Sequence, residues 1–183
     1  MVTILLGNGF EEVEALTPCD VLRRGGVEVR LAGIGGKAVT GGHGITVMAD
    51  CAAEELDDCG EMLVLPGGLG GVASIRGSKA AMQTVERAWQ SGRFVAAICA
   101  APTLLAELGI TDGKTVTCYP GMETQMGDAH CTGLPAVRDG RLICGRSAGT
   151  ATEFSLALLE ALRGREAAER VCEAIHFEGE YHG

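Results

Sequence analysis

Short apolar runs recur along the chain and are separated by segments with helical spacing. The runs Val2–Leu6 and Phe94–Ile98, and the segment from Glu61 to Leu65, are almost wholly apolar. Such runs are typical of strands that are buried on both faces of a sheet. A fourth run, Val27–Ala32, alternates apolar and polar residues. The pattern therefore predicts several short strands, most of them buried.

Helical segments follow these strands. The segment from Glu11 to Arg24 has acidic residues in its first turn and Arg23 and Arg24 in its last, which matches the helix dipole, and glycines follow it. Pro18 should bend this helix. Because strands and helices alternate from end to end, the sequence predicts one α/β domain over residues 1–183, with a doubly wound, mostly parallel sheet and helices on both faces. The other helices are expected at 72–75, 78–91, 102–108, 151–162 and 165–175.

Turn residues predict where the remaining short strands and hairpins lie. The glycine-rich stretch 33–44 predicts a short edge strand, paired with 45–48. Asp139-Gly140 predicts a hairpin, and Thr150–Glu153 fits a capping box for the helix that follows. The remaining expectations are a turn or short helix at 53–56, a strand at 115–118, an irregular stretch at 120–129, hairpin strands at 136–138 and 142–144, and a loose tail at 177–183.

Cys99 lies where an apolar strand turns into a helix. Alanines surround it, and Pro102 fits a first helical turn. A tight strand-to-helix turn lifts one side chain clear of the sheet, as in the nucleophile elbow of hydrolases. The helix start would favour a thiolate there. The alternative is that Cys99 is a small buried hydrophobe, and this stretch alone leaves both interpretations open.

Composition excludes several classes of partner. The chain has 183 residues, a net charge of −9 and no basic cluster longer than Arg23-Arg24, which disfavours nucleic acid and anionic membrane surfaces. No apolar run approaches the roughly 20 residues of a membrane span, and the N-terminus is predicted to be a strand and not a signal peptide. The eight cysteines include no C-x-x-C pair. We expect reduced thiols in a cytoplasmic protein without a metal.

Acidic residues and histidines offer partners for Cys99. In parallel sheets, sites form at the carboxyl ends of strands, and 7–14, 66–71 and 99–101 lie at such ends. Glu11 and Glu12 fit solvated acids of a first helical turn, whereas Glu14 can point along the sheet toward Cys99, where burial would raise its pKa. Of four histidines, His130 follows a predicted strand in an irregular region. Whether it pairs with a cysteine cannot be deduced from sequence distance.

A glycine motif also invites a nucleotide-binding interpretation. Gly68-Leu69-Gly70-Gly71-Val72-Ala73 fits a loose dinucleotide fingerprint. However, this glycine motif is not in the first strand–helix unit. The strand that follows it also ends at Cys99, where a dinucleotide-binding fold would have an acidic residue. The first such turn is followed by Glu11 and Glu12, which would repel a pyrophosphate. The sequence therefore predicts no nucleotide cofactor.

Four motifs together resemble the DJ-1/ThiJ/PfpI superfamily, in which they occur in the same order. The resemblance runs from about Val2 to Val171. They are Gly9-Phe10-Glu11-Glu12-Val13-Glu14, Leu65-Pro66-Gly67-Gly68, Ala96-Ala97-Ile98-Cys99-Ala100-Ala101-Pro102 and Arg146-Ser147-Ala148-Gly149-Thr150. The chain looks most similar to the branch that holds the Parkinson-associated protein and bacterial ThiJ-like relatives. The resemblance implies a flavodoxin-like fold and a homodimer.

The resemblance also implies roles for residues. Cys99 would be the nucleophilic, oxidisable cysteine and Glu14 its protonated carboxyl partner. The backbone amides of Gly68 and Ala100 would form an oxyanion hole, and His130 matches a position proposed for an acid or base. Arg23, Arg24 and Arg146 match positions around the dimer and the site.

Three functions follow from this resemblance. The first is a cofactor-independent glyoxalase or protein deglycase, in which Cys99 attacks methylglyoxal, glyoxal or their adducts on proteins. The second is a redox sensor or stress-linked chaperone that is switched by oxidation of Cys99. The third, a peptidase or amidase, is disfavoured because such members carry histidine directly after the cysteine, where this chain has Ala100.

Overall fold

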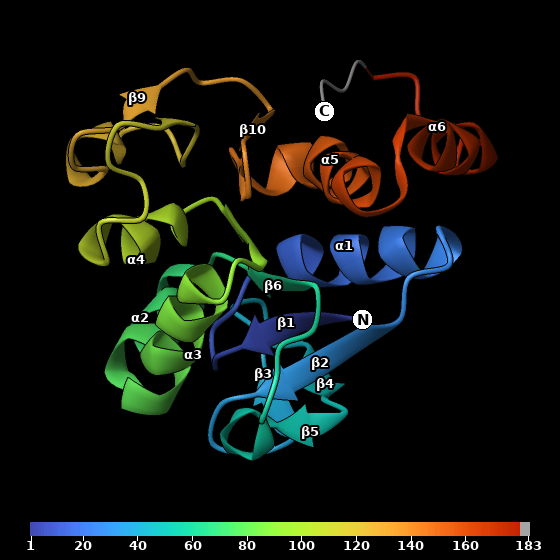
Figure 1. The fold of residues 1–183 in the computed structure, drawn as a ribbon. Helices are drawn as coiled ribbons and strands as arrows, with labels where there is room; N and C mark the ends of the chain where they lie inside the picture. The colour runs from blue at the N-terminus through green and yellow to red at the C-terminus, as the bar shows by residue number, and fades with distance from the viewer. Residues whose placement is uncertain (180–183) are drawn as a thin grey trace.

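The structure is a computed structural model that describes residues 1–179. Within them, one seven-stranded sheet has the order β10-β11-β7-β6-β1-β2-β5 (Figure 1). All neighbouring strands are parallel except β10, which pairs antiparallel with β11. The strands are β1 (Val2–Leu6), β2 (Val29–Gly33), β5 (Cys51–Ala52), β6 (Met62–Leu65), β7 (Phe94–Ile98), β10 (Ala136–Asp139) and β11 (Leu142–Gly145).

Helices cover both faces of this sheet. One face packs against α1 (Glu12–Arg24) and α5 (Ala151–Arg163), which Figure 1 shows side by side, and α6 (Arg165–Ala174) packs on α5. The other face packs against α2 (Leu69–Gly77), α3 (Lys79–Gln90) and α4 (Pro102–Glu107). The doubly wound α/β fold expected from the sequence is confirmed.

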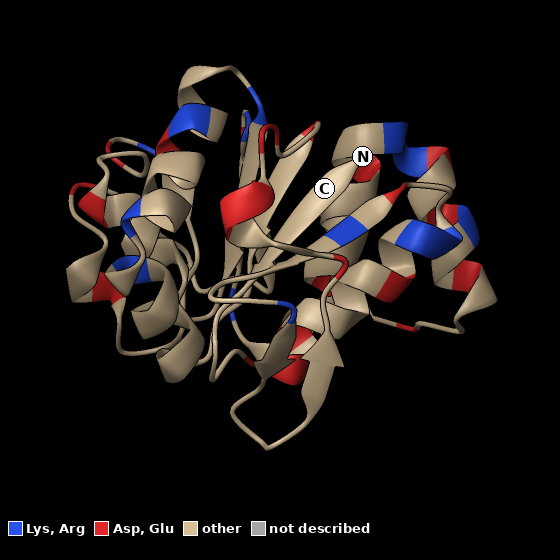
Figure 2. Cartoon of the chain, turned by 90° about the horizontal axis from the view of Figure 1, so that it is seen from below, with Lys and Arg blue, Asp and Glu red and all other residues tan. Residues whose placement is uncertain are grey.

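Alternation along the strands divides the core in two. In β1, Val2, Ile4 and Leu6 join the cluster under α1 and α5, whereas Leu5 joins the cluster under α3 and α4. Successive side chains of a strand point to opposite faces of the sheet. An unbroken apolar run such as β1 therefore supplies side chains to both core clusters. Charged residues lie mostly on the outer helices and loops (Figure 2).

Two small sheets lie outside the main one. β3 (Ala38–Thr40) pairs antiparallel with β4 (Thr46–Met48), as expected for the glycine-rich region. β8 (Thr115–Val116) pairs in parallel with β9 (His130–Cys131). Three short 3₁₀ segments complete the described elements: η1 (Ala53–Glu55), η2 (Glu123–Gln125) and η3 (Ala148–Thr150).

Several local predictions are confirmed. The Asp139-Gly140 hairpin joins β10 to β11, and the helix expected at 78–91 is α3, at whose start the hydroxyl of Ser78 accepts a hydrogen bond from the Ala81 amide. Pro18 lies within α1, and the bend expected there stays a prediction. None of the helices in residues 1–179 combines the length and apolar character needed to cross a membrane.

Other local predictions are wrong. The Thr150 hydroxyl does not cap α5, because it donates to the Ser147 carbonyl and accepts from the Ser147 amide inside η3. The second strand begins at Val29, since the Val27 amide is bonded to the Leu22 carbonyl and closes the end of α1.

The predicted strand at 115–118 and the predicted loose tail also differ. β8 ends at Val116, because its partner β9 has only two residues. The tail is anchored at its start: the Phe177 amide donates to the Cys172 carbonyl, and its ring packs against the core. The rest of the predicted tail, 180–183, lies outside the described residues.

Candidate active site

Cys99 occupies a strained turn between β7 and α4. Its φ angle is +66°, a left-handed conformation that is unusual for a residue other than glycine. The turn is fixed on both sides, since the Cys99 amide donates to the Gly145 carbonyl at 3.0 Å and the Ala101 amide donates to the Ile98 carbonyl at 3.1 Å. The neighbouring alanines are buried. The sharp turn predicted from the small residues is therefore present, at the carboxyl end of the sheet.

Glu14 reaches this turn from the first helix. Its side chain is fully buried, and its Oε2 accepts a hydrogen bond of 2.8 Å from the Gly67 amide. The carboxyl lies close enough to the Cys99 side chain for each group to shift the pKa of the other, and its second oxygen, Oε1, is buried without a hydrogen-bond partner among the described residues. Gly67 lies between the two, because a Cβ there would be 2.5 Å from Glu14 Oε2 and 2.7 Å from Cys99 Cβ. Only glycine leaves room for this contact.

Burial and mutual charge set the protonation of the pair. Burial raises the pKa of the Glu14 carboxyl to about 7, against hydrogen bonds from Cys99 and Gly67 that favour its charged form. Burial and the Glu14 charge raise the pKa of the Cys99 thiol to about 12. Groups in such contact titrate together. Near pH 7 the pair therefore loses its first proton, and above that pH one negative charge is shared between carboxyl and sulfur.

Two backbone amides face the sulfur. Hydrogen bonds from the amides of Ala100 and Gly68 lower the pKa of the Cys99 thiol, although burial and Glu14 outweigh them. Gly68 has a φ angle of +80°, and a Cβ there would be 2.5 Å from the Gly9 carbonyl oxygen. The expectation that the helix start would favour a thiolate is wrong as a net effect, because burial first and Glu14 second raise the pKa of the thiol by more than the two amides lower it.

A cavity of about 260 Å³ opens onto Cys99, whereas the fully buried Glu14 is not among the residues that line it. Sequence reasoning did not single out two side chains that line it, Tyr119 and Met122. The Tyr119 amide donates to the Cys99 carbonyl at 2.8 Å, and this tyrosine is half exposed. Tyr119 follows a strand of only two residues, so no periodic pattern of apolar positions marks it in the sequence. The full lining is Glu11, Gly68, Leu69, Cys99, Ala100, Tyr119 and Met122.

His130 does not line this cavity. It lies in β9, its side chain is exposed, and its amide donates to the Lys114 carbonyl. Arg23 and Arg24 lie at the far end of α1 from Glu14, where they face Asp50 and Asp20.

Arg146 is likewise absent from the cavity lining. Its guanidinium donates to the Gly133 carbonyl at 2.9 Å, and its amide donates to the Pro135 carbonyl. Its visible role is to hold the loop that leads into β10.

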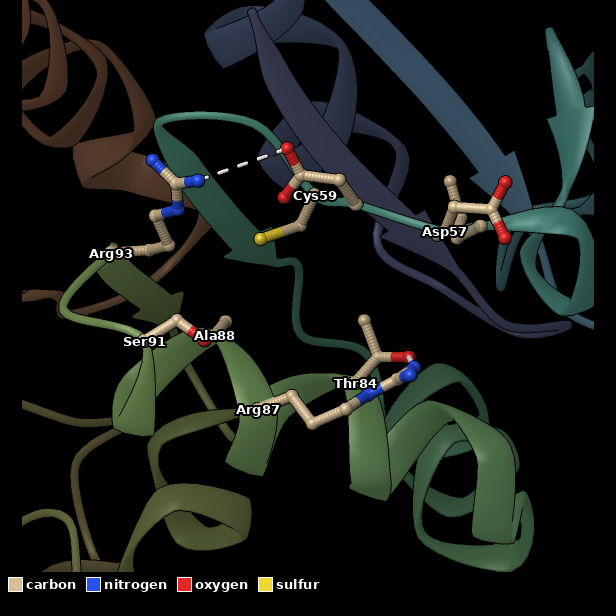
Figure 3. A pocket seen from close by; sticks show the side chains of 9 residues that line it. Asp57, Cys59, Thr84, Arg87, Ala88, Ser91 and Arg93 are labelled. Carbon is tan, nitrogen blue, oxygen red and sulfur yellow. Dashed lines mark hydrogen bonds and ion pairs between the residues drawn. The ribbon is translucent and has the colours of Figure 1, made fainter.

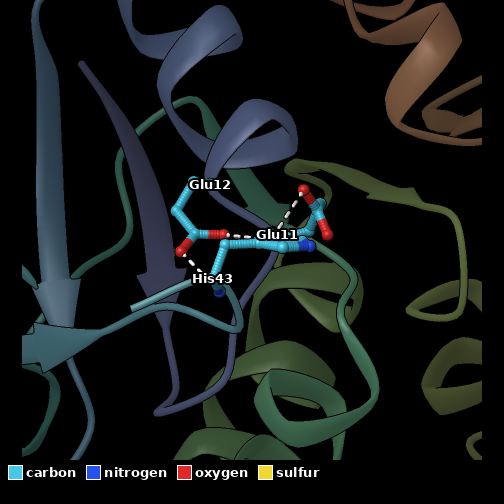
Figure 4. A group of neighbouring side chains, drawn as sticks. All are labelled: Glu11, Glu12 and His43. Carbon is cyan, nitrogen blue, oxygen red and sulfur yellow. Dashed lines mark hydrogen bonds and ion pairs between the residues drawn. The ribbon is translucent and has the colours of Figure 1, made fainter. Parts of the chain in front are cut away.

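The start of α1 contains a second polar group (Figure 4). His43 Nδ1 lies 2.9 Å from Glu12 Oε2 and 3.6 Å from Glu11 Oε1. Burial of Glu12 is outweighed by hydrogen bonds from His43 and from the amides of His43 and Ile45, so the pKa of Glu12 falls to about 2. Glu12 is thus buried and not a solvated acid as predicted. The three ligand atoms lie within 4.8 Å of one another, and the histidine already pairs with both acids.

Glu12→Ala will loosen the loop between β3 and β4. It removes the acceptor of the His43 amide at 2.8 Å and of the His43 ring. We expect the free energy of unfolding, measured with urea, to fall by about 2 kcal/mol. The control is Glu54→Ala, which removes an exposed carboxylate from the Gly35 amide and should change it by less than about 0.5 kcal/mol. Equal losses in both variants would contradict this assignment.

Another cavity, of about 160 Å³, lies at the other end of the central strands (Figure 3). It is formed by the loop before β6, the end of α3 and the start of β7, and it includes Cys59, Arg87 and Arg93. The Arg93 guanidinium is 3.9 Å from Asp58. Because it borders the amino ends of the strands, this cavity is separate from the Cys99 site.

The comparisons with known proteins agree with this geometry. Residues 1–161 match the DJ-1/PfpI family. The chain belongs to this family. Among its DJ-1 relatives, protein dj-1beta of Drosophila melanogaster is 38% identical over 176 residues and 94% of each chain. A deglycase of Pyrococcus abyssi is 35% identical over 151 residues, which cover 81% of this chain and 90% of the relative.

Solved DJ-1 structures share the fold. The crystal structure of Drosophila melanogaster DJ-1beta has a TM-score of 0.89 at 35% identity and covers 96% of both chains. A DJ-1 superfamily protein from Salmonella typhimurium has a TM-score of 0.91 at 29% identity, with 97% of this chain and 98% of that chain covered. The flavodoxin-like fold implied by the resemblance is therefore confirmed.

Proposed function

We propose that the protein is a cysteine-dependent, cofactor-independent glyoxalase or deglycase. The observation that carries this proposal is the contact of a fully buried carboxyl, Glu14, with Cys99 at the mouth of a cavity of about 260 Å³. Such a pair combines a nucleophile with a proton carrier whose pKa of about 7 matches neutral conditions. The deglycase among its relatives supports the same class of reaction.

In the proposed reaction, Cys99 sulfur attacks the aldehyde carbon of methylglyoxal. A carbon–sulfur bond forms, the carbonyl π electrons move to oxygen, and the amides of Gly68 and Ala100 stabilise that oxygen. Glu14 takes the proton from the former aldehyde carbon and returns it to the neighbouring carbon, and the proton that the Glu14–Cys99 pair holds at the start ends on the neighbouring oxygen as the hydroxyl, which leaves a lactoyl thioester. Water then cleaves the thioester, so that lactate and the free thiol are released. For glycated proteins, the leaving group would be the amine of the adduct.

A role for His130 in proton transfer stays a prediction, because its side chain is exposed and does not line the cavity. Tyr119, which does line the cavity, is better placed to hydrogen-bond a substrate oxygen. Ala100, where peptidase members carry histidine, disfavours amide hydrolysis. We place the protein in the cytoplasm as part of this proposal, since the reaction requires a reduced Cys99.

The test is the formation of lactate from methylglyoxal by the wild-type protein, without glutathione and with a metal chelator present. We expect sustained turnover that stops when Cys99 is alkylated, with the modified residue identified by peptide mapping. If no lactate forms, the aldehyde reaction is ruled out, and the same preparation then tests the second candidate.

That candidate is redox sensing at Cys99. It is favoured by the two amides and the carboxyl that surround the sulfur, since the same groups would stabilise a sulfinate. Under this alternative, Cys99 would oxidise readily and the protein would show no turnover. Mass spectrometry of the peroxide-treated protein distinguishes oxidised from unmodified Cys99.

We also propose a homodimer. Four large apolar side chains are exposed around the start of α1 and the neighbouring hairpin, and the Ile45 amide is bonded to Glu12, which joins the two segments. Exposed apolar patches commonly mark protein–protein contacts. The four side chains are Val13, Leu16, Ile45 and Met48.

Leu16→Glu will weaken this dimer by at least about 30-fold, because a carboxylate would be buried without a partner in an apolar interface. Dissociation can be followed by light scattering after size-exclusion chromatography over a dilution series. The control is Leu134→Glu, which changes an exposed leucine outside the patch. An equal effect of both variants, or a wild-type monomer, would overturn the proposed surface.

A further inference from the structure

Two cysteines that the proposed function does not use lie against each other beside the Cys99 cavity. Cys131 is in β9, and its partner in the register of the small parallel sheet is Val116. Cys118 follows that partner by two residues. The Thr132 amide donates to the Val116 carbonyl at 3.0 Å, which fixes the two segments together. Both side chains pack against the same core cluster, and Cys131 lies close enough to Cys118 to help raise the pKa of the Cys118 thiol, after burial.

The two thiols differ in access. Cys118 is only 3% exposed, whereas Cys131 is partly exposed. A small oxidant can therefore reach Cys131 directly, and Cys118 lies behind it. An accessible thiol beside a second thiol that can resolve its sulfenic acid is an arrangement often found at redox-sensitive cysteines. We propose that Cys118 and Cys131 are a redox pair that closes to a disulfide when the protein meets a hydroperoxide.

The chemistry balances with the hydroperoxide as the oxidant. The Cys131 sulfur attacks the peroxide oxygen, the O–O bond breaks, and a sulfenic acid and one water (or alcohol) are formed. The Cys118 sulfur then attacks the Cys131 sulfur, so that the S–S bond forms and the S–O bond breaks. The proton of Cys118 leaves with the hydroxyl as water. Two electrons pass from the thiols to the peroxide, and a dithiol reductant reverses the change.

The position of the pair connects it with the candidate active site. Cys118 directly precedes Tyr119, whose amide is bonded to the Cys99 carbonyl and whose side chain lines the cavity. A bond between Cys118 and β9 would fix the segment that carries this tyrosine. The inference goes beyond the proposed function and does not depend on it, because the disulfide can be detected without any substrate.

The experiment treats the full-length protein with hydrogen peroxide, blocks free thiols and maps the peptides without reduction. We expect a cross-linked peptide pair that joins Cys118 to Cys131, lighter by two hydrogens, that a reductant separates. In Cys118→Ser, the sulfenic acid on Cys131 has no partner, so labelling of Cys131 by dimedone should rise about tenfold over the wild type. In Cys131→Ser, the buried Cys118 should stay reduced.

Cys51→Ser is the matched control, since Cys51 is also partly exposed but lies in β5 at the far edge of the sheet. It should leave the cross-link unchanged. Three results would overturn the proposal: a link from Cys118 to Cys144 or Cys99, oxidation of Cys131 beyond the sulfenic acid in the wild type while Cys118 stays free, or no reaction of either thiol. Circular dichroism of each variant verifies that the fold is retained.

Discussion

Cys99→Ala will lower the rate of lactate formation from methylglyoxal by about 10³-fold or more, because it removes the sulfur that bonds the aldehyde carbon. The substitution keeps the Cβ atom and with it the backbone geometry of a residue at a φ angle of +66°. We therefore expect a folded protein with an intact cavity and no turnover. Lactate can be measured with a coupled dehydrogenase assay, and thermal denaturation verifies folding.

The matched control is Cys51→Ala, which removes a partly exposed thiol from the opposite edge of the sheet. Its rate should equal that of the wild type. If Cys99→Ala keeps the wild-type rate, the aldehyde reaction does not depend on this sulfur and the proposed mechanism is wrong. If neither protein forms lactate while Cys99 of the wild type is alkylated rapidly below neutral pH, redox sensing becomes the better assignment.

The sequence predicts the Cys99 turn because its determinants are local. An apolar strand, small flanking residues and Pro102 are adjacent in the chain, and the turn that they predict is present. The approach of Glu14 is less local, but two strong regularities govern it. α1 is the next element after β1, and β1, β6 and β7 are successive neighbours in a parallel sheet, so the residues that follow these strands meet at the carboxyl end of the sheet.

Other parts of the site depend on loop paths that no periodic pattern encodes. Tyr119 reaches the cavity because the segment after β8 returns to the Cys99 carbonyl. Glu12 is buried because His43, 31 residues away, folds over it. Thr150 bonds backward to Ser147 and not forward to its helix. In each case, a hydrogen bond between distant or competing partners determines where the residue lies. The residue type alone is compatible with both the predicted and the observed position.

Glu14→Gln will reduce turnover and increase stability at the same time. Glutamine has the same shape and can accept the hydrogen bond from the Gly67 amide, but it cannot carry a proton. We expect kcat/KM to fall by about 10²–10⁴-fold. In the wild type, kcat/KM should rise as the pair loses its first proton near pH 7. In the variant, only the buried thiol titrates, so the rise should move to higher pH. An unchanged inflection would contradict the shared charge.

The stability effect follows from the same pKa of Glu14. Burial raises this pKa from 4.5 to about 7 in the folded protein, so the folded state keeps a proton that the unfolded chain loses. The contribution of Glu14 to stability is therefore fully present below pH 4.5 and is lost as the pH rises through 7, by about 3 kcal/mol in total. Glutamine has no such dependence. Urea denaturation should show equal stabilities for the two proteins at low pH and a more stable variant at pH 8. A variant that is less stable than the wild type at pH 8 would show that the buried carboxylate does not destabilise the fold.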